Sequence, residues 1–489
     1  MNTNNNWNWS AEEMQQIGYR MVDIITEYLD TLPEKAVFTP VPKELVETFL
    51  TTAAPQEGID AETILEEFVA QVAPYPFGNG HPRFYGWINS PPAVISVFAE
   101  ALAAAMNPSV AGGNHAPVYV EHQVLNWFKE LIGFPAESQG LLVSGGSMAN
   151  LTALTVARHA KAGLDIRAEG IQGLPAKLIV YTSEEGHSCI RKAVELLGIG
   201  SNQLRLIPTD SNFRMDVAAL EAAITDDLAN GHRPIAVAAS AGTVNTGAID
   251  PLEAIAAICE KYDLWLHVDG AYGSPAILSK QYQSQLAPLA LADSIALDPH
   301  KWMYMPVETG LVMVKNGETM RDAFSFVPPY LRFDKSESAV GGLPWFSEYG
   351  IQQTRGFRSL KVWMALKYFG LSGYKEMIEH DIALAEYLAE LVRQSPDLEL
   401  IEPVSLSIVC FRYVPDDWQG NDEALNKLNT NLIEALQLSG QAFVSGTTLR
   451  GKFLLRTCVV NPNGVKEDFD HLVAVVRRIG EEMVRLKNA

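Results

Sequence analysis

The sequence predicts an α/β fold with a large domain on a mostly parallel sheet, a smaller C-terminal α+β domain and an N-terminal helical arm. Two observations lead to this prediction. Short apolar runs alternate with helical patterns in the middle of the chain, as in a parallel sheet covered by helices. The chain also has 489 residues and 47% hydrophobic content, enough for more than one domain. We place the arm at residues 1–85, the large domain at 86–370 and the small domain at 371–489.

The arm begins with an amphipathic helix that has a clear start signal. Ser10 and Glu13 form a capping-box pattern, and apolar residues follow at helical spacing. A second helix is predicted around 61–72. Several prolines interrupt the chain between the two helices, and the arm is too small to form a hydrophobic core of its own. We therefore expect it to pack on another surface.

The two domains differ in the order of their predicted elements. In the large domain, the five apolar runs read as strands of one sheet; in the small domain, strands flank a helix. Between them, a helix runs from Lys361 to about Gly370, and Gly373 marks a break before a long helix. The predicted strands are 178–181, 235–238, 264–268, 294–297, 311–314, 398–412 and 453–459, and the helices after the break are 376–394 and 423–438.

Lys301 and Asp269 are the residues on which the predicted chemistry depends. A lysine does covalent chemistry when its amine condenses with an aldehyde, and pyridoxal phosphate (PLP) is the common cofactor that arrives as one. PLP is an electron sink that works best when a carboxylate keeps its ring nitrogen protonated. Asp269 ends one predicted strand and Lys301 follows the next, so neighbouring strand ends can hold both groups over one ring.

A phosphate group needs backbone donors at the start of a helix, and segment 143–150 supplies them. A strand end, two glycines and two hydroxyls precede an apolar helix there. Gly146 and Ser147 are therefore the predicted phosphate ligands. The segment also nearly fits the nucleophile elbow of serine hydrolases, but Ala149 replaces the final glycine of that motif.

Several motifs together resemble the group II PLP-dependent amino-acid decarboxylases, and most of all the aromatic L-amino-acid decarboxylases. They follow the family's order over most of the chain. The resemblance implies an aspartate-aminotransferase-like PLP fold (fold type I) and a homodimer with its active site between subunits, in which the N-terminal helices embrace the partner. The motifs are HPRF at 81–84, SGGS at 144–147, HSCIRKA at 187–193, HVD at 267–269, PHKW at 299–302 and FRSLK at 357–361.

The resemblance also implies roles for individual residues. Lys301 is predicted to bind PLP covalently, Asp269 to contact the ring nitrogen and His187 to stack on the ring. Tyr330, in a polar, glycine-ended segment that reads as a lid, matches the family's proposed proton donor. The further predicted cofactor contacts are His300 and Thr243, with Thr246 as an alternative because Val244 stands where the family often has a second threonine.

The substrate prediction rests on the first of these motifs. Trp87 and Ile88 match the positions where the family holds aromatic rings, and Ser90 matches a residue near the substrate carboxylate. The predicted reaction converts an aromatic L-amino acid, such as tyrosine, tryptophan, phenylalanine or dihydroxyphenylalanine, into its amine and CO2. Asn89 and Thr354 depart from the family pattern, so the preferred ring stays open, as do acidic and small aliphatic substrates.

Three alternative functions remain compatible with the sequence. The first is a PLP enzyme that makes aldehydes by oxidative decarboxylation. Relatives of that kind have a phenylalanine at the position that matches Tyr330, so the tyrosine argues against it. The second is a serine hydrolase built on Ser147. The third is a PLP-binding subunit without turnover, which the intact set of Lys301, Asp269, His187 and Tyr330 argues against.

Composition and charge limit the classes of partner that the chain is expected to bind. The formal net charge of −21 would repel nucleic acid over most of the surface. The four cysteines lack metal-like spacing and the start lacks a secretion signal, so we expect no metal and a cytoplasmic location. The apolar stretch 93–106 contains Glu100 and is shorter than the ~20 residues that cross a bilayer, so no membrane span is expected.

Overall fold

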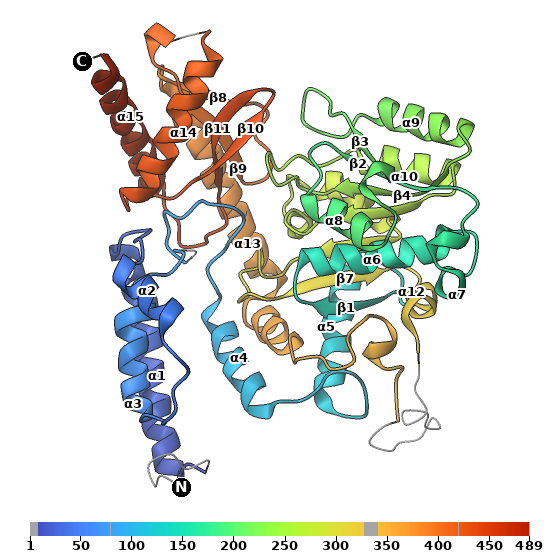
Figure 1. Cartoon of the computed structure of the whole chain (residues 1–489), viewed down its shortest axis with the longest axis horizontal. Helices are drawn as coiled ribbons and strands as arrows, with labels where there is room; N and C mark the ends of the chain where they lie inside the picture. Colours follow the sequence, from blue (N-terminus) through green and yellow to red (C-terminus); the bar gives the residue numbers. More distant parts are fainter. Residues whose placement is uncertain (1–7, 79, 327–340, 419, 489) are drawn as a thin grey trace.

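The computed structural model describes residues 8–78, 80–326, 341–418 and 420–488. They form two units, each built on one sheet, and a group of N-terminal helices (Figure 1). One sheet has seven strands in the order β1-β7-β6-β5-β4-β2-β3, and the other has four in the order β10-β11-β9-β8. The α/β class is therefore confirmed, while the predicted domain limits stay a prediction.

The seven-stranded sheet is mostly parallel, as predicted. Strands β2 to β6 pair in parallel, and β7 is antiparallel to both of its neighbours. All five predicted strands are present. Of the other two, β1 supplies the strand end expected before the glycine turn, and β3 is an edge strand whose partial burial weakens its apolar signal. The bounds are β1 (Gln139–Val143), β2 (Leu178–Ser183), β3 (Leu204–Ile207), β4 (Arg233–Ser240), β5 (Trp265–Asp269), β6 (Ser294–Leu297) and β7 (Gly310–Val314).

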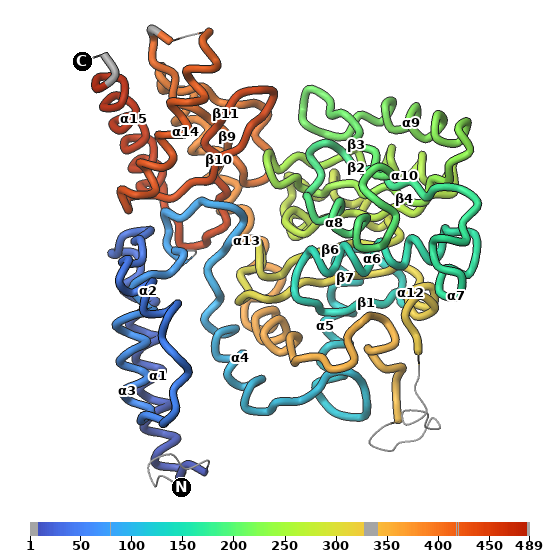
Figure 2. The backbone as a smooth tube through the Cα atoms, viewed as in Figure 1, coloured from blue at the N-terminus to red at the C-terminus, as the bar shows by residue number. Residues whose placement is uncertain are grey.

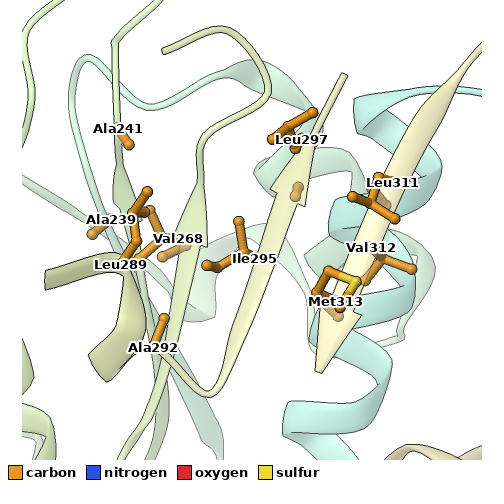
Figure 3. Packing of buried hydrophobic residues seen from close by; sticks show 14 of the residues in the cluster. Ala239, Ala241, Val268, Leu289, Ala292, Ile295, Leu297, Leu311, Val312 and Met313 are labelled. Carbon is orange, nitrogen blue, oxygen red and sulfur yellow. The ribbon is translucent and has the colours of Figure 1, made fainter. Parts of the chain in front are cut away.

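The centre of this sheet is apolar because helices cover its faces. Figure 3 shows Val268 of β5, Ile295 of β6 and Val312 of β7 side by side in the core, and each is at most 1% exposed. Some polar side chains also lie within the sheet, and Thr182 of β2 and His267 of β5 are buried there. The helices of this unit are α4 (Val94–Met106), α5 (Ala116–Ile132), α6 (Gly146–Lys161), α7 (Ile166–Glu169), α8 (Ser188–Leu196), α9 (Val217–Ala229), α10 (Leu252–Lys261), α11 (Gln283–Leu286) and α12 (Gly317–Phe324).

The C-terminal unit corrects two predicted boundaries. The helix break lies at Gly370 and not at Gly373, because Gly370 has the left-handed φ of 65° that glycine tolerates best. The predicted strand 398–412 is two antiparallel strands separated by a turn that contains Pro403. The elements are α13 (Ser359–Gln394), β8 (Leu398–Leu400), β9 (Ile408–Tyr413), α14 (Asp422–Leu438), β10 (Ser445–Leu449), β11 (Lys452–Cys458) and α15 (Lys466–Asn488); β10 was not predicted.

The N-terminal helices lie to one side, away from the seven-stranded sheet (Figure 2). They are α1 (Ala11–Thr31), α2 (Lys43–Thr51) and α3 (Ala61–Glu67), and a π-helical turn (Phe68–Val72) continues α3. The predicted capping box between Ser10 and Glu13 is present at the start of α1. Neither α2 nor α3 has a buried residue, and Val46, Phe49 and Leu50 on α2 and Ile64 on α3 are exposed. Among the described helices, none has the length and apolar character to cross a membrane.

Candidate active site

The carboxyl ends of five strands meet at one edge of the seven-stranded sheet and enclose a cavity of about 520 Å³. Ser144 follows β1, His187 follows β2, Thr243 follows β4, Asp269 ends β5 and Lys301 follows β6. All five line the cavity, so the structure brings together residues that the sequence placed at separate strand ends. The other predicted residues on its wall are Trp87, Ile88, Gly146, Ser147 and His300.

Lys301 has an anionic partner beside it. Its Nζ lies 3.1 Å from Oδ2 of Asp298, which is buried, while its own side chain is 22% exposed. Burial acts to lower the pKa of Lys301, but the charges of Asp298 and Asp269 outweigh burial and the pKa is raised. The lysine therefore rests as an ammonium ion paired with Asp298, and the charge of Asp269 also favours this form.

The Asp269 carboxylate is fixed by donors on both of its oxygens. The backbone N–H of Ala271 donates to Oδ1 at 3.1 Å, and the Asn150 side-chain amide donates to Oδ2 at 3.2 Å. Cys189 lies beside the same carboxylate, and burial raises the pKa of its thiol. The contact with Asn150 was not predicted; its sequence signal is a position one helical turn after Gly146.

His187 is the N-cap residue of α8, and its side chain opens onto the cavity. Its Nδ1 accepts a hydrogen bond from the backbone N–H of Cys189 at 3.2 Å. Desolvation by the surrounding protein lowers the pKa of His187. The ring is therefore neutral near pH 7, with its proton on Nε2.

The first turn of α6 approaches the Lys301 side of the cavity closely. A Cβ added at Gly146 would lie 2.7 Å from Oδ2 of Asp298 and 3.3 Å from Cβ of Ala271. No larger residue fits at this position without a shift. The exposed Ser147 follows on the same turn, so the free N–H groups of a helix start face the cavity here.

The remaining predicted residues are placed differently from one another. Trp87 is 46% exposed and Ile88 is buried in the wall. The Ser90 hydroxyl lies behind the wall and donates to the His300 carbonyl at 3.2 Å. The Thr243 and Thr246 hydroxyls are buried and 2.9 Å apart, and only Thr243 borders the cavity.

Two further predictions concern the lid tyrosine and metal binding. Tyr330 lies outside the described residues, so its predicted role stays a prediction. Within the residues that are described, no group of three or more His, Cys, Asp or Glu side chains is placed to hold a metal ion.

A buried carboxylate on α13 anchors the segment that carries Lys301. Oδ2 of Asp381 accepts hydrogen bonds from Nε1 of Trp302 at 2.8 Å and from the Tyr304 hydroxyl at 2.7 Å. The ring of Trp302 also stacks on Tyr272. The sequence did not predict this anchor, because Asp381 and Trp302 are 79 residues apart and no local pattern connects them.

Comparison with known proteins gives consistent matches over nearly the whole chain. Residues 42–414 match the pyridoxal-dependent decarboxylase conserved domain. An aromatic-L-amino-acid decarboxylase of Bacillus atrophaeus is 36% identical over 97% of this chain and 97% of its own. A phenylacetaldehyde synthase of Arabidopsis thaliana is 29% identical over 92% of each chain. The crystal structure of Oryza sativa TDC with PLP and tryptamine has a TM-score of 0.90 at 25% identity, covering 98% of this chain and 100% of that one.

The buried Asp381 carboxylate predicts a pH-dependent stability. Burial raises the pKa of Asp381 to about 7, whereas an aspartate in an unfolded chain titrates near 4. Between these pH values the folded state holds the extra proton, so the free energy of unfolding falls as the pH rises through this window. Asp381→Asn removes the titration and keeps an oxygen that can accept from Trp302 and Tyr304.

We expect the melting temperature of Asp381→Asn, relative to wild type, to increase from about pH 4 to about pH 7 and then to level off. Thermal melts of both proteins in the same buffer series measure this difference. A difference that stays constant over the whole range would contradict the buried, titrating carboxylate.

Proposed function

Because the chain belongs to the pyridoxal-dependent decarboxylase family, we propose that this PLP-dependent decarboxylase converts an aromatic L-amino acid into its amine and CO2. The observation that carries the aromatic preference is the 36% identity to an aromatic-L-amino-acid decarboxylase over 97% of both chains. Trp87 and Ile88 on the cavity wall supply the flat and apolar surfaces that suit an aromatic ring. Tyrosine, tryptophan, phenylalanine and dihydroxyphenylalanine are the candidate substrates.

The donor set of the cavity fits PLP. An amine for the aldehyde, a carboxylate for the ring nitrogen and a helix start for the phosphate all face one space of about 520 Å³. Glycine at position 146 lets the first turn of α6 approach Asp298 and Ala271 closely, because a side chain there would meet both. Asp298 is a second carboxylate near this cradle, and its pairing with Lys301 offsets its charge.

Each group then has a task. Lys301 would hold the aldehyde end through its amine, Asp269 would accept a hydrogen bond from the protonated ring nitrogen, and the neutral His187 ring would pack against the cofactor. Bound PLP would supply an electron sink for the electrons that the departing CO2 leaves behind. Thr243 and His300 would complete the wall, and Gly146 and Ser147 would hold the phosphate.

The α-carbon must receive a proton before the amine leaves, and we assign this step to Tyr330. A phenol hydroxyl can donate that proton and be re-protonated by solvent afterwards. Ser90 contributes indirectly in this arrangement, since its hydroxyl holds the backbone carbonyl of His300 next to Lys301.

The cofactor assignment predicts a spectroscopic result. Purified protein with added PLP should show a visible absorption band that is lost in Lys301→Ala, because only a lysine amine in the cavity can condense with the aldehyde. In the same cuvette, a panel of L-amino acids with CO2 detection identifies the substrate. Lys280→Ala, at an exposed lysine, is the control and should keep the band. A band that survives in Lys301→Ala, or no band at all, would overturn the assignment.

The role of Tyr330 predicts which product forms. Tyr330→Phe should lower the yield of amine per CO2 and raise the yields of aldehyde, ammonia and peroxide with consumption of O2, because the proton donor is lost while decarboxylation continues. Chromatography of the products against CO2 released measures this ratio. An unchanged amine yield would exclude Tyr330 as the donor. An aldehyde already formed by the wild type would favour the alternative function of the aldehyde-forming relative.

We also propose that the active form is a homodimer held in part by the N-terminal helices. Phe49 and Leu50 on α2 are 54% and 80% exposed, and Ile64 on α3 is 52% exposed. Apolar surface gathered on helices without a core marks an interaction surface.

A cytoplasmic location also suits the chain, because all four cysteines are buried free thiols.

The dimer proposal is tested by measuring mass in solution. Light scattering of wild type should give twice the 53.6 kDa chain mass, and Leu50→Glu should shift the protein toward monomer because it places a charge in the apolar interface. Leu486→Glu is a matched control, since Leu486 is also 80% exposed but lies on α15. A monomeric wild type, or equal effects of both substitutions, would contradict the proposal.

A further inference from the structure

A chain of buried hydrogen bonds runs through the sheet to Asp269. Oδ1 of Asn150 lies 2.6 Å from Nε2 of His267, whose Nδ1 lies 2.9 Å from the Ser294 hydroxyl. The indole Nε1 of Trp265 donates to the same hydroxyl at 2.7 Å. Asn150, His267 and Ser294 are fully buried and Trp265 is 5% exposed, so water does not compete for these bonds.

The direction of these bonds is determined at the Asn150 end. Nδ2 of Asn150 donates to the Gly146 carbonyl at 2.8 Å, and a carbonyl can only accept. Oδ1 of Asn150 therefore faces His267, whose Nε2 must carry the proton. In a neutral ring Nδ1 then accepts, so the Ser294 hydroxyl donates to it and uses a lone pair to accept from the indole of Trp265.

The neutral ring is the stable form near pH 7. Burial lowers the pKa of His267 to about 4, so the ring keeps one proton and one lone pair at neutral pH. The Asn150 amide consequently has a single orientation. Its second N–H is shared between Oδ2 of Asp269 at 3.2 Å and Sγ of Cys189 at 3.4 Å.

We propose that Trp265, Ser294, His267 and Asn150 form a positioning relay that fixes the Asp269 carboxylate against the ring nitrogen of the cofactor. His267 is its central positioning residue, and it does not line the cavity. Without the Nε2–H of His267, Oδ1 of Asn150 loses its donor and the bond to the Gly146 carbonyl alone orients the amide, which weakens the hydrogen bond to Oδ2 of Asp269. This proposal rests on the proposed role of Asp269.

The test compares PLP with 1-deaza-pyridoxal phosphate, in which C–H replaces the ring nitrogen. Both compounds keep the aldehyde and the phosphate, so the ratio of their dissociation constants isolates the contact with Asp269. Fluorescence titration of cofactor-free protein measures both constants without turnover. Wild type should prefer PLP at least tenfold, the effect of a charge-assisted hydrogen bond.

Two amide substitutions at one position form the matched pair. His267→Asn still reaches Ser294 but is too short for Asn150, so the preference for PLP should fall about tenfold. His267→Gln places an N–H within reach of Asn150 and should keep most of the preference. Ser294→Ala leaves His267 in place but removes the hydrogen bond to its Nδ1, so the preference for PLP should fall several-fold. This variant decides the test if His267→Asn does not fold.

The control is Thr182→Val on β2. The Thr182 hydroxyl is buried and donates to the Ala238 carbonyl in the same sheet, but it takes no part in the relay. The preference of the Thr182→Val protein for PLP over the deaza compound should equal that of wild type. The relay is overturned if the preference survives in His267→Asn and Ser294→Ala, or if Thr182→Val lowers it as much. A wild type that binds both compounds equally overturns the role of Asp269 itself, and the relay with it.

Discussion

The contact between the Lys301 ammonium and the Asp298 carboxylate is the interaction on which the site depends. A lysine in an apolar interior normally loses its proton, because desolvation penalises the charged form. Here the carboxylates of Asp298 and Asp269 reverse that effect and raise the pKa of Lys301. The amine is therefore kept in one place, at the edge of the sheet where Lys301 lines the cavity.

Two networks of buried hydrogen bonds lie behind Asp269 and Lys301. Behind Asp269, an amide, an imidazole, a hydroxyl and an indole follow one another, and each group has its donors and acceptors used in a single order. Behind Lys301, the Asp381 carboxylate ties Trp302 and Tyr304 to α13. Buried polar groups are costly when unpaired, so these networks restrict the positions of the groups that line the cavity.

The anchor at Asp381 also connects the two sheet-based units. It lies on the part of α13 beyond the break at Gly370, and α13 contacts β8 and β9 of the C-terminal sheet. The segment that carries Lys301 thus packs against an element shared with the second unit. A shift of α13 would move the lysine, which makes the position of this helix part of the active-site geometry.

The sequence by itself determined the parts of this protein that local patterns encode. The strands before Asp269 and Lys301, the glycine turn at Gly146 and the capping box at Ser10 follow from apolar runs and capping residues, whose signals span only a few positions. The motifs also identified the family. Tertiary structure alone decided the partners of the buried polar groups. Asn150 and Asp269 are 119 residues apart, as Trp302 and Asp381 are 79 apart, and only the packing of α6 and α13 on the sheet brings them into contact. Hydrogen bonds of this kind depend on the positions of whole elements, and no periodicity along the chain records them.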